Sequence, residues 1–146
     1  MRDLPILWKR LVVQGETCPR CGSTERALEA AMARLEPALK ALGLRPVLET
    51  RPMEEAAFRA APAESNRIWI DGRPLEAWLG ARSADSPCCD VCGDLPCRTV
   101  EVEGRTYEAI PAELIVKAAL IAASQRIGPG AGAASPPCCA PGRGCR

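Results

Sequence analysis

The fold is set by residues 5–21, PILWKRLVVQGETCPRC, in which an aliphatic run leads into a pair of cysteines. A short run of large apolar side chains followed by a turn is typical of a buried strand, and we expect one over residues 5–13. From about Ser23 to about Leu42, leucine or methionine recurs at intervals of four and three residues. That spacing predicts a helix with one buried face, so the Cys-Pro-Arg-Cys motif is expected where a strand passes into a helix.

Shorter patterns predict the remaining elements. Pro37 lies inside the first helix and lacks a backbone N–H, so we expect it to bend the helix or split it in two. Asp71-Gly72 supplies the positive φ angles of a hairpin turn between RIWI and RPL, and Pro74 makes the second strand an edge strand or a very short one. The other expected elements are a strand over 44–50, a short helix over 53–60, a helix from Glu76 to Leu79, a hairpin over 98–110 and a helix from Pro111 to about Ser124.

Cysteine is the residue type that carries the chemistry, because the 146-residue chain has nine cysteines and no histidine. The net charge of +1, without a basic stripe rich in aromatic residues, does not predict a nucleic-acid partner. No apolar run has the length of a membrane span and the N-terminus lacks the features of a signal peptide, so we expect a cytoplasmic protein with reduced thiols and no membrane partner. The cysteines form three groups: Cys18 and Cys21; Cys88, Cys89, Cys92 and Cys97; and Cys138, Cys139 and Cys145.

The Cys18 and Cys21 pair has the spacing of a redox site or a soft-metal site. Two intervening residues let both sulfurs face one partner, either the other sulfur or one metal ion. The N-terminus of a helix favours the thiolate form of a cysteine, and Arg20 adds a nearby cation. The alternative is a structural zinc site, because CPRCG at 18–22 and CDVCG at 89–93 both match a zinc knuckle and together supply four thiolates.

The second group places Cys88, Cys89 and Cys92 within five residues, with Cys97 available as a fourth ligand. Three thiolates suit soft ions, namely zinc, copper(I), mercury(II) and three-coordinate arsenic(III). Two further roles stay open: a zinc loop that pins the hairpin over 98–110, and resolving thiols of a redox enzyme. A more remote alternative is cleavage of a carbon–mercury bond, with Asp90 as the proton donor.

The order strand, CxxC, helix, strand, helix, strand, strand, helix over residues 5–80 resembles thioredoxin-like proteins, glutaredoxins in particular. IWIDGRPL stands in place of the glutaredoxin-type Ile-Asp-Gly hairpin. The segments SNRIWIDGRPLEAWLG and SPCCDVCGDLPCRTVEVEG look closer still to an uncharacterised prokaryotic thioredoxin-like family, which covers most of the chain up to about residue 124. This resemblance implies a thioredoxin-like fold and brings no assigned activity.

The chain departs from the redox members of that fold at one position. Those proteins have a cis-proline just before the third strand, whereas this chain has Ser65-Asn66-Arg67 there, with Pro62 and Pro74 offset. The departure favours a metal role over oxidoreductase activity. The vicinal Cys138 and Cys139 resemble, in pattern only, the cysteines of the thioredoxin-like arsenic metallochaperone, which makes the tail cysteines, Cys145 included, accessory candidates.

We therefore predict an α/β, thioredoxin-like domain (β-α-β-α-β-β-α) over residues 1–126, with a Cys-rich loop, β-hairpin and helix added over about 81–126. A disordered Gly/Pro/Cys tail is expected over 127–146. The predicted function is binding or transfer of a soft metal or metalloid ion by the first two cysteine groups, with no cofactor required beyond zinc or another soft ion. The alternatives are a thiol–disulfide oxidoreductase that uses Cys18 and Cys21 on a thiol or disulfide protein, and a structural four-cysteine zinc module. Whether the protein is an enzyme, and its oligomeric state, stay open.

Overall fold

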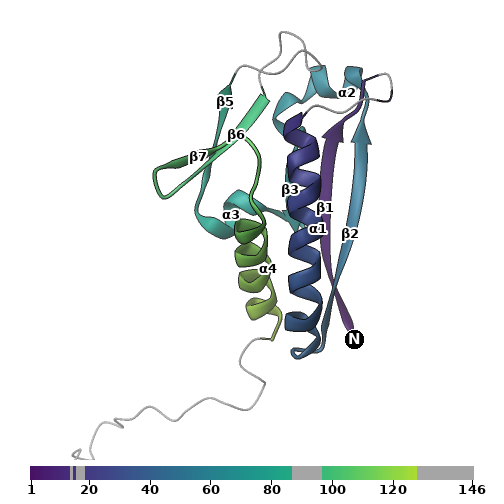
Figure 1. Ribbon diagram of the computed structural model, residues 1–146, viewed down its shortest axis with the longest axis vertical. Coiled ribbons are helices and arrows are strands. Elements are labelled where there is room, and N and C mark those ends of the chain that lie inside the picture. Colours follow the sequence, from purple (N-terminus) through teal and green to yellow (C-terminus); the bar gives the residue numbers. More distant parts are fainter. Residues whose placement is uncertain (14, 16–18, 87–96, 128–146) are drawn as a thin grey trace, which may run out of the picture.

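The computed structural model describes residues 1–13, 15, 19–86 and 97–127, which form two sheets and a layer of helices (Figure 1). The larger sheet is mixed and has the strand order β2-β1-β3-β4. Strand β1 pairs in parallel with β2 and antiparallel with β3, and β3 pairs antiparallel with β4. The bounds are Arg2–Leu11 for β1, Leu44–Met53 for β2, Arg67–Ile70 for β3 and Arg73–Pro74 for β4.

The two faces of the larger sheet differ in burial. In β1, the side chains of Leu4, Ile6 and Trp8 are buried under the helices, because successive side chains of a strand point to opposite faces. The alternate positions are more open: Pro5 is exposed and Leu7 is half-buried. The helix over Pro19–Lys40 therefore packs on the face of Leu4, Ile6 and Trp8, and the opposite face is accessible at Pro5 and Leu7.

Strand β2 lies at the edge of the sheet and carries two prolines on its outer side. The carbonyl oxygens of Gly43 and Met53 accept hydrogen bonds from the N–H groups of Arg2 and Val12, so the odd-numbered positions of β2 point toward β1. The even-numbered positions, which include Pro46 and Pro52, point away from it. Proline is tolerated there because no ladder hydrogen bond is lost, and the missing donors discourage pairing with another strand.

Helix α1, Pro19–Lys40, lies along the sheet and buries Leu28, Leu35 and Leu39 against it. The expectation that Pro37 would split this helix is wrong, since α1 continues through Pro37 to Lys40. The proline lies within one turn of the end and on the exposed side. The carbonyl that it leaves without an intrahelical donor belongs to Ala33, which is itself exposed, so water can satisfy it.

The other helices are α2 (Glu55–Ala60), the 3-10 helix η1 (Pro62–Glu64), α3 (Leu75–Leu79) and α4 (Ala112–Ile127). Helix α4 packs against α1 and α3 and buries four alanines, whose small side chains permit a close approach: Ala118, Ala119, Ala122 and Ala123. It ends at Ile127, beyond the expected limit near Ser124. In the part of the chain that the structure describes, none of the helices combines the length and the hydrophobicity that a membrane span requires.

The smaller sheet is antiparallel and has the order β5-β6-β7. Its strands are Arg82–Ser86, Cys97–Val102 and Arg105–Tyr107. The expected hairpin over 98–110 is present as β6 and β7, whereas β5 was not expected from the sequence. Buried Thr99 donates its hydroxyl to the carbonyl oxygen of Ala84 at 3.1 Å, which ties β6 to β5 within the sheet.

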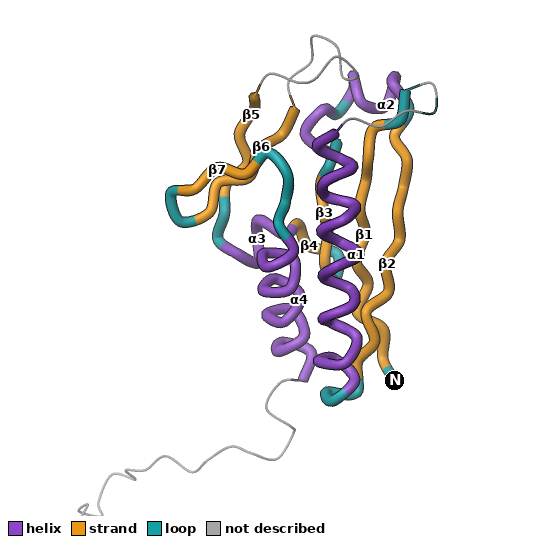
Figure 2. Tube along the Cα trace, viewed as in Figure 1, coloured by secondary structure: helices purple, strands orange, loops and turns teal. Residues whose placement is uncertain are grey.

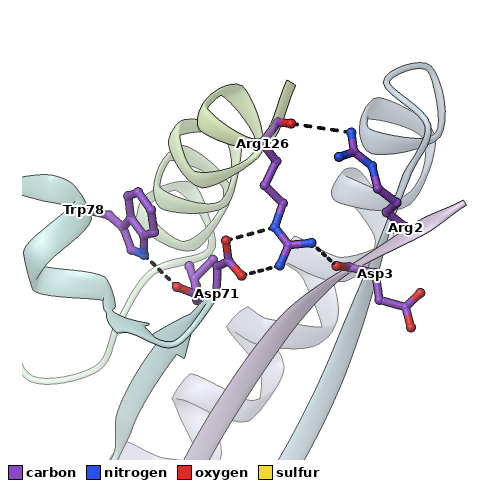
Figure 3. A network of polar contacts seen from close by, with 6 residues as sticks. Arg2, Asp3, Asp71, Trp78 and Arg126 are labelled. Atoms are coloured by element: carbon purple, nitrogen blue, oxygen red, sulfur yellow. Dashed lines mark hydrogen bonds and ion pairs between the residues drawn. The ribbon is translucent and has the colours of Figure 1, made fainter. Parts of the chain in front are cut away.

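A polar cluster fastens the end of α4 to the larger sheet (Figure 3). The guanidinium of Arg126 forms a bidentate ion pair with the carboxylate of Asp71 and donates to the backbone oxygen of Asp3 at 2.6 Å. Arg2 in turn donates to the backbone oxygen of Arg126. This ion pair lowers the pKa of Asp71. The C-terminal end of α4 is thereby held beside the start of β1 and the turn between β3 and β4.

Candidate functional site

Several chain ends that flank the predicted cysteine sites meet at one end of the molecule (Figure 2). The carboxyl end of β1, the first turn of α1, the loop from η1 into β3, and the paired ends of β5 and β6 all lie there. Ser86 and Cys97 are direct partners in the β5–β6 register, and β6 packs against η1. The larger and smaller sheets thus both contribute to this end, which we call the thiol end.

Cys21 is the predicted ligand that the structure describes in most detail. It is the third residue of α1, and its side chain is 1% exposed and belongs to the hydrophobic core. The following turn is also buried: Thr24 is 0% exposed, and its hydroxyl accepts a hydrogen bond from the N–H of Ile110 at 3.4 Å. A partner that binds the Cys21 sulfur therefore has to replace some of the packing around it.

A buried polar pair lies at the same end and was not predicted from the sequence. Trp8 donates its indole N–H to the side-chain oxygen of Asn66 at 3.1 Å. Asn66 is 8% exposed and has a φ of 57°, a left-handed conformation that asparagine tolerates better than most residues. The pair fixes the loop that leads into β3, and the sequence signal for it was an asparagine just ahead of a strand.

The expected departure from the redox pattern has a structural counterpart at this loop. Asn66 directly precedes β3, and Pro62 is instead the first residue of η1. The peptide bonds in the described ranges include no cis bond. In this part of the chain, the backbone before β3 is turned by Asn66 in the left-handed conformation.

Two basic side chains at the thiol end form ion pairs. Arg10 contacts both carboxylate oxygens of Glu25 at 3.3 Å and lies over the Trp8 ring, with 5.6 Å between the guanidinium carbon and the ring centroid. Lys9 contacts Glu64 at 2.8 Å. The Nε of Arg10 is buried and has no hydrogen-bond acceptor among the described residues. The Nε of Arg67, at the start of β3, is likewise buried without a hydrogen-bond acceptor among the described residues, so this end retains two such donors.

Two open depressions border the thiol end on the side of α2. One has a volume of about 640 Å³ and is lined by Val12, Val13, Glu54, Glu55, Ala56 and Arg59. The other, of about 390 Å³, is lined by Lys9, Arg51, Pro52, Met53, Glu54, Ala57 and Glu64. Their linings mix aliphatic and charged side chains, which suits contact with a polypeptide segment better than enclosure of a small molecule.

The remaining predicted ligands are described only in part or not at all. Cys97 starts β6, and its backbone is placed by the pairing with Ser86. Within the described ranges, no three or more Cys, Asp or Glu side chains form a group that could hold a metal ion. Asp90 lies outside the described residues, and so do the other predicted site residues: Cys18, Cys88, Cys89, Cys92, Cys138, Cys139 and Cys145. The tail expected from residue 127 also lies outside them, apart from Ile127, which ends α4.

Comparison with known proteins identifies the family of this chain and a relative from an archaeon. The chain is 45% identical over 113 residues to an uncharacterized protein of Archaeoglobus fulgidus, which corresponds to 77% of this chain and 82% of the relative. No solved structure matches the chain significantly. Residues 4–119 match the family model described as a domain of unknown function, DUF2703. Because this match covers most of the chain, the protein belongs to the DUF2703 family.

Proposed function

We propose that this protein is a thioredoxin-like thiol protein that binds or transfers a soft metal or metalloid ion. Cys18 and Cys21 form one ligand pair, and Cys88, Cys89 and Cys92 form a second set with Cys97 as a fourth ligand. The strand order β2-β1-β3-β4, with β1 parallel to β2 and the other pairs antiparallel, supports the thioredoxin-like assignment. The entry of α1 directly after β1 supports a thiol site at their junction.

The proposal rests on one observation. The described residues that flank the two cysteine-bearing segments lie together at the thiol end. Ser86 and Cys97 are register partners, so the segment between them leaves and returns at one place. Cys88 is two residues from Ser86 and Cys92 is five residues from Cys97, a reach of at most about 17 Å from the end of this sheet. This short reach supports a second cysteine group near the end of the molecule where α1 begins.

The chemistry of the ligand set supports a soft ion. Thiolates select copper(I), zinc and related thiophilic ions over hard cations, and the chain offers no histidine as a competing ligand. The buried Nε of Arg10 at the same end is a donor suited to a thiolate sulfur or to an anionic group.

The test is anaerobic titration of the reduced, metal-free protein with mercury(II), copper(I) and arsenite. We expect tight binding of at least one of these ions, weakened about tenfold or more in Cys18→Ser/Cys21→Ser and in Cys88→Ser/Cys89→Ser/Cys92→Ser, because each variant removes ligands. Cys138→Ser/Cys139→Ser is the matched control and should bind like the parent. Equal binding by the parent and the Cys18→Ser/Cys21→Ser variant would remove the first pair from the site.

A thiol–disulfide oxidoreductase is the second candidate, favoured by the position of Cys21 in the first turn of a helix that follows a buried strand. In that case Cys18 attacks a disulfide and Cys21 resolves the mixed disulfide, with a protein dithiol as the product. Reduction of insulin disulfides under a dithiol reductant distinguishes the two functions. Catalysed reduction that is lost in Cys18→Ser would support the enzyme, and no turnover would leave the ion-binding function.

Metal analysis of the purified protein separates both functions from a structural zinc module. One firmly bound zinc with four masked thiols would favour the structural module. A protein that carries no zinc and in which the core thiols react freely would favour ion capture or redox chemistry.

A further inference from the structure

The open face of the larger sheet carries an apolar groove on the side away from α1. Pro5, Leu7, Trp69, Gly72 and Glu49 line this groove, whose volume is about 340 Å³. Leu7 and Trp69 are direct partners in the β1–β3 register, and both are half-buried. A tryptophan beside a proline and a leucine, on a face that the helices leave open, is typical of a surface that recognises a short extended segment.

Two basic side chains pack against the ring of Trp69. The ammonium of Lys9 lies 5.0 Å from the ring centroid and the guanidinium carbon of Arg67 lies 5.4 Å from it. Lys9 is paired with Glu64, and Arg67 lies 3.7 Å from Glu76. The groove is thus a preformed apolar surface whose neighbouring cations are compensated, so it offers little attraction to a highly charged partner.

The end of α4 lies close to this groove because of the polar cluster in Figure 3. Arg126 pairs with Asp71, which directly precedes the groove residue Gly72, and donates to the backbone of Asp3. Leu7 lies four residues along β1 from Asp3, a distance of about 13 Å. The chain beyond Ile127 therefore starts near the end of the sheet where Gly72 borders the groove.

The segment that follows has a composition suited to such a groove. Residues 128–134, GPGAGAA, lead to Ser135-Pro136-Pro137, and Pro136 is nine residues beyond Ile127. A glycine-rich link of this length has a root-mean-square span of about 15–18 Å, which exceeds the separation of about 13 Å between Asp3 and Leu7 along β1. Adjacent prolines favour the polyproline II conformation, which docks on aromatic grooves with little loss of conformational entropy.

We propose that the Ser135-Pro136-Pro137 segment of this chain docks in the Trp69 groove of the same chain. Docking holds Cys138 and Cys139, which follow Pro137 directly, beside the open sheet face and not at the thiol end.

The test uses the full chain, reduced and free of metal, and follows the indole N–H resonance of Trp69 by NMR. Trp8 and Trp78 donate their indole N–H groups to Asn66 and Ile70 inside the protein, so they serve as internal references. The resonance that disappears in Trp69→Phe identifies Trp69. Pro136→Ala/Pro137→Ala should shift this resonance by more than its linewidth, while the matched control Pro129→Ala/Pro141→Ala should leave it in place.

Two outcomes would overturn the proposal. The first is a Trp69 resonance in Pro136→Ala/Pro137→Ala that coincides with that of the parent. The second is a Trp69 resonance in the parent that moves to the position of this variant on dilution, because that would show a second copy of the chain as the occupant. Neither outcome depends on metal binding, so the proposal fails or stands separately from the proposed function.

Discussion

At the scale of single residues, the Arg126–Asp71 pair is the contact that joins the last helix to the sheet. A bidentate guanidinium–carboxylate pair adds geometric specificity to electrostatic attraction, and here both side chains are only about one-quarter exposed (29% and 27%). The same arginine also reaches the backbone of Asp3, so one side chain links α4, β1 and the turn after β3. Residues that are 55 positions apart in sequence are brought together by this pair.

Replacement of Asp71 by asparagine should lower the free energy of unfolding by about 1–2 kcal/mol at neutral pH, because it removes the negative charge that pairs with Arg126. The loss is moderate because water already screens part of the attraction between the two side chains. Since the pKa of Asp71 is lowered in the folded protein, its contribution is complete above the unfolded pKa and is lost as the pH falls through the folded pKa. Urea denaturation of parent and variant at neutral and acid pH measures both effects. Asp3→Asn is the control, because its side chain makes an exposed pair with Arg45; a stability difference for Asp71→Asn that persists at low pH would contradict this account.

Asn66 has two roles that one substitution removes together. Asn66→Ala deprives the buried Trp8 indole of its acceptor and places a less tolerant residue at a φ of 57°. We expect a loss of about 2–3 kcal/mol in the free energy of unfolding. Asn66→Gly accepts the backbone angle and loses only the hydrogen bond, so it should cost less than Asn66→Ala by urea denaturation. Equal losses in the two variants would show that the backbone angle costs nothing.

At the scale of elements, β2 shows how an edge strand is kept from pairing with other chains. Pro46 and Pro52 occupy positions of β2 whose backbone groups point away from β1, while the alternate positions complete the ladder with β1. An edge strand of ten residues would otherwise offer a long row of unpaired donors and acceptors. The prolines therefore limit association through this edge at no cost to the sheet.

Pro52→Thr should restore an outward donor at an exposed position of β2 and promote self-association. Sedimentation velocity over a range of concentrations should show a larger average mass for this variant than for the parent. Arg51→Thr is the matched control, because its N–H points toward β1. If both variants sediment like the parent, the proline is not what protects this edge.

At the scale of the whole molecule, the two cysteine-bearing segments connect to the described fold at one end, and the tail connects to it at the other end. The first two have flanks at the thiol end, and α4 ends beside the start of β1. The α1 helix, which runs between these two ends, is about 33 Å long for its 22 residues. Core thiols and tail thiols are thus separated at their points of attachment by most of the length of the molecule.

Ion binding by the core cysteines should therefore stabilise the folded protein without help from the tail. Arsenite at about 100 times its dissociation constant should add about 2.7 kcal/mol, which corresponds to a rise in Tm of about 5–10 °C. Cys138→Ser/Cys139→Ser should keep this rise and Cys88→Ser/Cys89→Ser/Cys92→Ser should lose it, as measured by differential scanning calorimetry. A rise that vanishes only in the tail variant would move the ion site to the tail.

The sequence by itself predicted most local elements, because their patterns are periodic and short in range. The leucine spacing of α1 marked the buried face, and Asp71-Gly72 marked the turn between β3 and β4. Cys21 follows a strand, as expected, but it lies inside α1, which begins at Pro19 and not near Ser23. Such features depend on neighbours within a few residues, which the sequence displays directly.

Tertiary structure decided what depends on distant partners. It kept α1 intact through Pro37, because the exposed last turn tolerates the lost hydrogen bond. It added β5, whose polar sequence has no strand pattern and which forms only because β6 supplies its ladder. Three further features follow from the order of strands in the sheet and from the packing of α4 on α1: the Asn66–Trp8 contact, the Arg126–Asp71 contact and the burial of Cys21. No local spacing of residues encodes the strand order or the helix packing.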